Sequence, residues 1–124
     1  MNGLHLTADL SGCAAEQPAL RDVGALRDLC LAAVRAAGLT PVGELFHSFG
    51  EHSGATGVVL LAESHLAVHT WPELGAVTLD AYVCNLGGDN SERARQLLGQ
   101  MVRAFAPTRV QRQQLQRGQV ASGH

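Results

Sequence analysis

The chain has 124 residues, a formal net charge of -2 and a sequence pI near 6.3. This length is typical of one domain that buries roughly two-thirds of its unfolded surface, so a core can form without metal or disulfide. The net charge does not indicate a positively charged surface for nucleic acid or an anionic membrane. The scarcity of aromatic residues argues against a base-stacking surface. We therefore expect a single domain over residues 1–124, with neither nucleic acid nor membrane as a partner.

Two further compositional features limit the function. The first residues, MNGLHLTADL, lack the basic and apolar regions of a signal peptide, and no apolar run reaches the ~20 residues of a membrane span, so the predicted location is cytoplasmic. Cys13, Cys30 and Cys84 are widely spaced, which predicts neither a disulfide framework nor a metal knuckle. All nine basic residues are Arg. Without lysine, the chain cannot hold an aldehyde cofactor such as pyridoxal phosphate as a lysine imine.

The hydrophobic pattern predicts strands and helices in a β-α-β-β-β-β-α-β order. Alternation of apolar and polar residues, or a short aliphatic run, predicts strands over 4–10, 41–49, 57–62, 66–71, 76–84 and 108–115. Apolar residues spaced three and four apart predict a helix over 19–37, which Gly38 and Pro41 end. The same spacing predicts a second helix over 91–105, with its apolar stripe at Ala94, Leu97, Leu98, Met101, Val102 and Phe105.

These elements predict an α+β fold, a two-layer sandwich in which two helices cover one face of an antiparallel sheet. Each helix is apolar on one side only, so each should pack on the sheet. The other face of the sheet would then be available to a second copy of the chain, and a homodimer is a reasonable expectation.

Residues 63–73 hold the highest density of reactive side chains, namely a serine, two histidines, two carboxylates and the single tryptophan. In a strand, His65 and His69 would stand about 13 Å apart, too far to share one metal. Ser64 lacks the glycine-flanked elbow of a hydrolase, and Gly50–Gly57 lacks the Lys-Ser/Thr of a phosphate loop. A strand histidine is more often structural than catalytic, but the concentration of reactive groups favours a site.

This segment closely resembles the self-cleavage motif of the small prokaryotic S-adenosylmethionine decarboxylases. The resemblance covers nearly the whole chain, and the matching stretches are His5-Leu6, Phe46-His47-Ser48-Phe49, the Ser-Gly-Ala-Thr-Gly-Val-Val run at 53–59, the motif at 61–73, and Cys84. The match is specific for the family and less specific for the substrate.

The resemblance implies self-processing at the Glu63–Ser64 bond. Ser64 would convert the peptide bond into an ester and then lose its α-proton and the Glu63 carboxylate, leaving a pyruvoyl group after hydrolysis. The products would be a β chain of residues 1–63 and an α chain of residues 64–124. His69 resembles the residue that accepts the α-proton. Thr56 replaces a family serine that assists the acyl shift. Strand alternation would place Ser64 and His69 on opposite faces, so we predict a bend or bulge between them.

The resemblance also implies the roles of the remaining site residues. The pyruvoyl carbonyl from Ser64 would form a Schiff base with the substrate amine, so that neither pyridoxal phosphate nor a metal is expected. Cys84 resembles the proton donor of the decarboxylation. Phe49 matches an aromatic residue that stacks on adenine, Glu73 a carboxylate that holds the ribose hydroxyls, and Leu61 a backbone contact to the base. Phe46 is left as a core residue.

The leading hypothesis is therefore decarboxylation of S-adenosylmethionine to the aminopropyl donor of spermidine biosynthesis. An alternative is the same pyruvoyl chemistry on a basic amino acid such as ornithine or arginine. Phe49 and Glu73 favour the nucleoside substrate, because a short amino acid needs neither stacking nor ribose contacts. A non-catalytic regulatory homologue is a weaker alternative, since it predicts loss of Ser64, His69 or Cys84, and all three are present.

Overall fold

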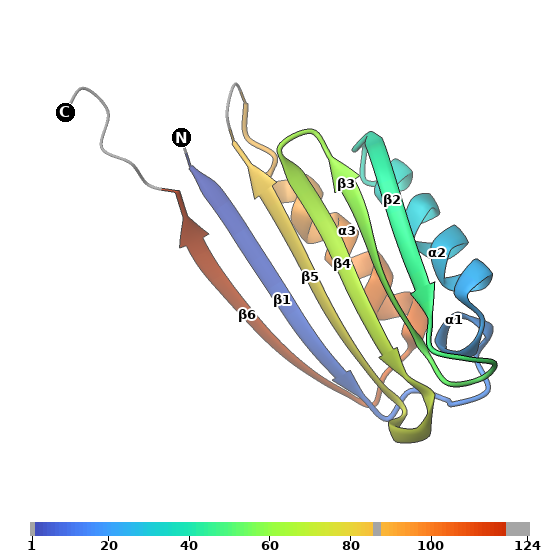
Figure 1. The fold of residues 1–124 in the computed structure, drawn as a ribbon. Coiled ribbons are helices and arrows are strands. Elements are labelled where there is room, and N and C mark those ends of the chain that lie inside the picture. The colour runs from blue at the N-terminus through green and yellow to red at the C-terminus, as the bar shows by residue number, and fades with distance from the viewer. Residues whose placement is uncertain (1, 86–87, 119–124) are drawn as a thin grey trace.

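The structure, a computed structural model, describes residues 2–85 and 88–118. Six strands form one antiparallel sheet in the order β2-β3-β4-β5-β1-β6. The strands are β1 (Gly3–Ser11), β2 (Pro41–Ser48), β3 (Ala55–Leu61), β4 (Ser64–Trp71), β5 (Ala76–Cys84) and β6 (Arg109–Arg117). The helices are α1 (Pro18–Arg21), α2 (Val23–Ala36) and α3 (Ser91–Phe105), and a short 3-10 turn, η1 (Pro72–Leu74), joins β4 to β5. All three α-helices lie on the same side of the sheet (Figure 1). The predicted α+β fold is confirmed.

The helix predicted over 19–37 is divided at Asp22. The Asp22 backbone is extended, and its carboxylate accepts a hydrogen bond from the Gly24 amide at 3.2 Å, so Asp22 ends α1 and caps α2. The apolar spacing continues across this break, which is why the pattern alone did not reveal it. The second predicted helix coincides with α3, and all six residues of its predicted stripe are buried.

The hydrophobic core lies between the helices and one face of the sheet. Alternate residues of the central strands point into it, such as Leu66 and Val68 of β4, and Phe105, Leu97 and Met101 of α3 pack against them. Phe46 packs on the edge of this core, as predicted.

The opposite side of the sheet is the open face, because no helix covers it within residues 2–85 and 88–118. It carries the other alternate residues of each strand, which include His5, His65, His69, Asp80 and Tyr82. None of the helices in the described part of the chain is long and apolar enough to cross a membrane.

Candidate active site

The predicted scissile bond lies at a tight turn between two central strands. Leu61 pairs with Ser64, so Ala62 and Glu63 form a two-residue connection between β3 and β4. Glu63 has a φ of +56°, in the left-handed region that non-glycine residues rarely occupy. Ala62 and Glu63 are both exposed to solvent. The Glu63–Ser64 peptide bond is thus accessible and follows a strained residue.

Ser64 and Cys84 lie next to each other at the end of the sheet where β4 begins and β5 ends. The Cys84 amide donates a hydrogen bond to Ser64 Oγ at 3.2 Å. Asn90, which precedes α3, donates from its side chain to the Cys84 carbonyl at 3.2 Å, and its backbone amide donates to Asn85 Oδ1 at 2.7 Å. These two asparagines fix the position of Cys84. Neither was predicted from the sequence to belong to the site.

Thr56 and His69 form a second pair, on neighbouring strands. They are directly opposite in the β3–β4 ladder, and Thr56 Oγ1 and His69 Nδ1 are hydrogen bonded at 2.5 Å. The Trp71 indole stacks on the His69 ring, with centroids 5.9 Å apart and planes inclined by 26°. The Thr56 hydroxyl and the Trp71 ring therefore hold the His69 imidazole in place from two sides.

The two pairs are far apart, and the bulge predicted between Ser64 and His69 is absent. β4 pairs with β3 over Ser64–His69 and with β5 over His65–Trp71, in both cases without a register shift. Ser64 shares the helix-facing side with buried Leu66 and Val68, whereas His69 lies on the open face. His69 follows Ser64 by five positions, which in a regular strand corresponds to about 16 Å. A bulge would require an extra residue opposite both neighbouring strands and would turn Leu66 and Val68 out of the core.

A cavity of about 310 Å³ lies at the His69 end of the sheet. Its lining combines aromatic and small polar side chains, from Phe49, Ser53, Ala55, His69, Thr70 and Trp71. The structure thus brings Phe49 and His69 together and adds Trp71, which had no site role in the sequence analysis. Phe49 is 60% exposed, and its ring, which contacts the His47 ring edge-to-face, remains accessible for stacking on a ligand.

The two remaining predicted contacts lie outside this cavity lining. Glu73 is exposed in η1, two residues beyond Trp71. Leu61 is buried in the core and pairs with Ser64, at the opposite end of β3 from Ala55. Its backbone is therefore closer to the scissile bond than to Phe49.

Comparisons with known proteins identify the family. Residues 4–118 match the family model described as S-adenosylmethionine decarboxylase. The S-adenosylmethionine decarboxylase proenzyme of Aquifex aeolicus is 42% identical over 94% of this chain and 81% of its own, and that of Persephonella marina is 40% identical over 95% and 84%. The crystal structure of the adenosylmethionine decarboxylase from Aquifex aeolicus superposes with a TM-score of 0.86, at 38% identity, over 98% of this chain and 95% of that one. This chain therefore belongs to the S-adenosylmethionine decarboxylase family, whose members are carboxy-lyases made as proenzymes.

Proposed function

We propose that this S-adenosylmethionine decarboxylase proenzyme cleaves itself between Glu63 and Ser64 and makes its pyruvoyl group from Ser64. The observation that supports this most directly is the position of Ser64. It is the first residue of β4, immediately after an exposed turn with a left-handed residue, and its Oγ is held by the Cys84 amide. The products are a β chain of residues 1–63 and an α chain of residues 64–124.

The processing chemistry uses groups of the chain itself. Ser64 Oγ attacks the Glu63 carbonyl carbon, the C–N bond breaks, and the hydroxyl proton ends on the released amine, giving an ester. A base then removes the Ser64 α-proton, and the Glu63 carboxylate leaves with the electrons of the C–O bond. Water replaces the nitrogen of the resulting dehydroalanine, ammonia departs and a ketone remains. His69 is the base in this proposal, because its imidazole is exposed, positioned by Thr56 and suited to proton transfer near neutral pH.

The pyruvoyl group would supply an electron sink, since its ketone condenses with the substrate α-amine and its conjugated carbonyl accepts the electrons released with CO₂. Cys84 is the proposed proton donor to the α-carbon, because its backbone is already hydrogen bonded to Ser64. Phe49 and Trp71 present aromatic faces for the adenine and the sulfonium cation, and Glu73 offers a carboxylate for the ribose hydroxyls.

The separation of the two pairs supports a homodimer with shared sites. Within one chain, His69 cannot reach Ser64 along about 16 Å of regular strand. A second copy stacked on the open face by a two-fold axis perpendicular to the strands would reverse the strand direction, so the His69 end of one sheet would meet the Ser64 end of the other. The open face also exposes Leu45, Leu60 and Leu115, apolar side chains that a second copy would cover.

Intact-mass measurement tests self-processing. The purified chain should give two fragments that separate at Glu63/Ser64, and the Ser64→Ala variant should stay whole. A wild-type chain that remains one uncut 13.0 kDa species would contradict the proposal. Release of CO₂ from S-adenosylmethionine, but not from ornithine or arginine, tests the substrate.

A complementation experiment tests whether the active site is formed by residues of both chains of the dimer or by one chain alone. Ser64→Ala cannot be cleaved, and His69→Asn retains Ser64 but lacks its base. If sites are shared, mixing the two variants under conditions that exchange subunits should cause cleavage of the His69→Asn chain, because the partner supplies His69. Cleavage of neither chain in mixed dimers, verified by mass, would show that His69 acts within its own chain or not at all.

A further inference from the structure

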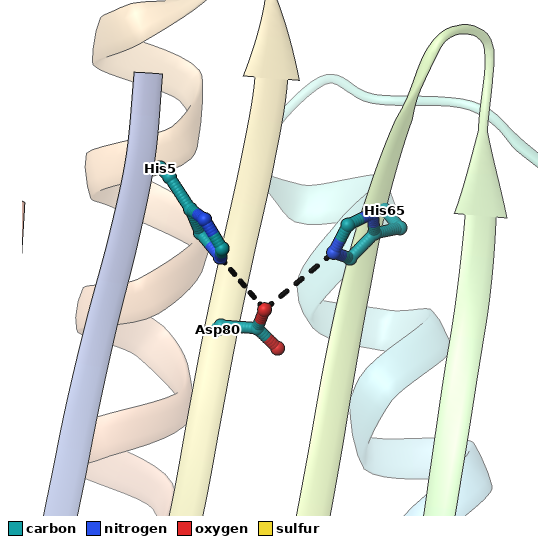
Figure 2. Close-up of side chains that lie close together, drawn as sticks. All are labelled: His5, His65 and Asp80. Carbon is teal, nitrogen blue, oxygen red and sulfur yellow. Dashed lines mark hydrogen bonds and ion pairs between the residues drawn. The ribbon is translucent and has the colours of Figure 1, made fainter. Parts of the chain in front are cut away.

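Three side chains of types that ligate metals converge on the open face, from three neighbouring strands. His5 comes from β1, His65 from β4, and Asp80 from β5, which lies between them in the sheet. Figure 2 shows both imidazoles directed at one carboxylate oxygen, with His5 Nε2 at 2.7 Å and His65 Nε2 at 3.5 Å from Asp80 Oδ2. The three ligand atoms all lie within 4.8 Å of one another. It is the one group of this kind in residues 2–85 and 88–118.

These separations suit a tetrahedral transition metal. Zinc binds imidazole nitrogen and carboxylate oxygen at about 2.0–2.2 Å, which places tetrahedral ligands about 3.3–3.6 Å from one another. The 3.5 Å between His65 Nε2 and Asp80 Oδ2 lies in that range, and the 2.7 Å hydrogen bond between His5 Nε2 and Asp80 Oδ2 would lengthen when the metal replaces its proton. All three side chains are only partly buried in the single chain, so a fourth ligand, either water or a group from a copy stacked on the open face, can complete the tetrahedron. Because strands rather than loops hold them, little reorganisation is needed.

The hydrogen bonds around His5 define the metal-free state. Arg117 Nη1 lies 3.1 Å from His5 Nδ1, and since a guanidinium can only donate, Nδ1 carries the lone pair. His5 Nε2 therefore holds the proton and donates it to Asp80. The Arg117 guanidinium also lies 5.7 Å from the centre of the Tyr82 ring, which stands between the two histidines. A metal at Nε2 must displace this proton and release Arg117 from His5.

We propose that His5, His65 and Asp80 form a binding site for a zinc-like divalent transition metal, and that Arg117 competes with this metal for His5. Its ligands are not the residues proposed for self-processing: His65 points to the open face whereas Ser64 lies on the helix side, and His69 stands four positions further along β4, about 13 Å away. All three ligands come from one chain, so the expected stoichiometry is one metal per chain.

Binding of Co²⁺ and Zn²⁺ to the full chain tests the site. Titration with Co²⁺ should produce the visible absorption of a tetrahedral ion, and calorimetry with Zn²⁺ should give one site per chain. Asp80→Asn and His65→Gln should each weaken binding by about tenfold or more, because each removes a ligand. His52→Gln is the matched control, since this histidine is exposed on a loop away from the cluster. Melting temperatures of the variants verify that each is folded.

Three outcomes would overturn the proposal. The first is that the parent chain does not bind Co²⁺, and the second is that Asp80→Asn and His65→Gln bind Co²⁺ as tightly as the parent chain. The third is a thiolate-to-cobalt charge-transfer band, which would assign the metal to a cysteine. Arg117→Gln keeps all three ligands and should bind Zn²⁺ several-fold more tightly, so unchanged or weaker binding would refute the competing role of Arg117. Because the readout is binding, none of these results depends on self-processing.

Discussion

Backbone strain at Glu63, in the turn before Ser64, should speed cleavage of the Glu63–Ser64 bond, and this effect can be measured. Glu63 has a φ of +56°, a conformation that costs an L-residue roughly 1–2 kcal/mol. Glycine does not pay this cost but loses roughly 0.5–1 kcal/mol of additional chain entropy on folding. Glu63→Gly and Glu63→Ala remove the same carboxylate, so comparing them isolates the backbone effect. The net difference should be about 1 kcal/mol.

In a Ser64→Ala background, which keeps the chain whole, Glu63→Gly should be more stable than Glu63→Ala by about 1 kcal/mol in chemical denaturation. In the chain that retains Ser64, cleavage releases strain that the glycine variant never stored. The glycine variant should therefore cleave about fivefold more slowly than the alanine variant, the factor that corresponds to 1 kcal/mol. Intact-mass spectra taken at intervals after refolding give both rates.

The unfolding measurement tests whether Glu63 is strained, and the cleavage rate tests whether that strain speeds cleavage. Equal free energies of unfolding in the Ser64→Ala background would refute the stored strain itself. A stability difference with equal cleavage rates would show that the strain exists but is not released in the rate-limiting step.

Three further predictions concern the site and the core. Thr56→Val removes the hydroxyl that contacts His69 and should slow cleavage by up to about tenfold in a gel time course, whereas Thr56→Ser should retain the rate. Leu97→Ala leaves a cavity at a fully buried position and should cost about 3 kcal/mol in urea unfolding, against less than about 0.5 kcal/mol for exposed Leu74→Ala. Burial raises the pKa of the Cys30 thiol to about 12, so iodoacetamide in mildly alkaline buffer should modify Cys30 only after denaturation, as peptide mass spectrometry would detect.

Much of the fold could be predicted from the sequence, because the apolar pattern alone decides which side of each element is buried. The six stripe residues of α3 were all predicted and are all buried. The break at Asp22 was missed because Leu20 and Val23 continue the helical spacing on either side, and a cap is a local hydrogen bond that hydrophobic periodicity does not record. The Asp-x-Gly sequence there was the available signal.

The site was predicted less completely than the fold. Resemblance supplied the identities of Ser64, His69 and Cys84, but the predicted bulge was wrong. β4 is paired on both sides, so its register is fixed by two neighbours at once, and a bulge would disrupt two ladders and the core. His5 and Asp80 were not considered together because 75 residues separate them, and only the strand order places them in contact.

The spacing of Ser64 and His69 has a different meaning in the folded chain from the one it suggests in the sequence. Five residues in a strand are a distance of about 16 Å and a change of face, so a motif that is compact in sequence is divided between two ends of the sheet. The same motif supplies a nucleophile at one end and a base at the other. If two copies stack with their strands reversed, each motif contributes half of each of two identical sites. A single short segment can then hold both the scissile bond and the base that completes its conversion, provided that the base acts on the other chain.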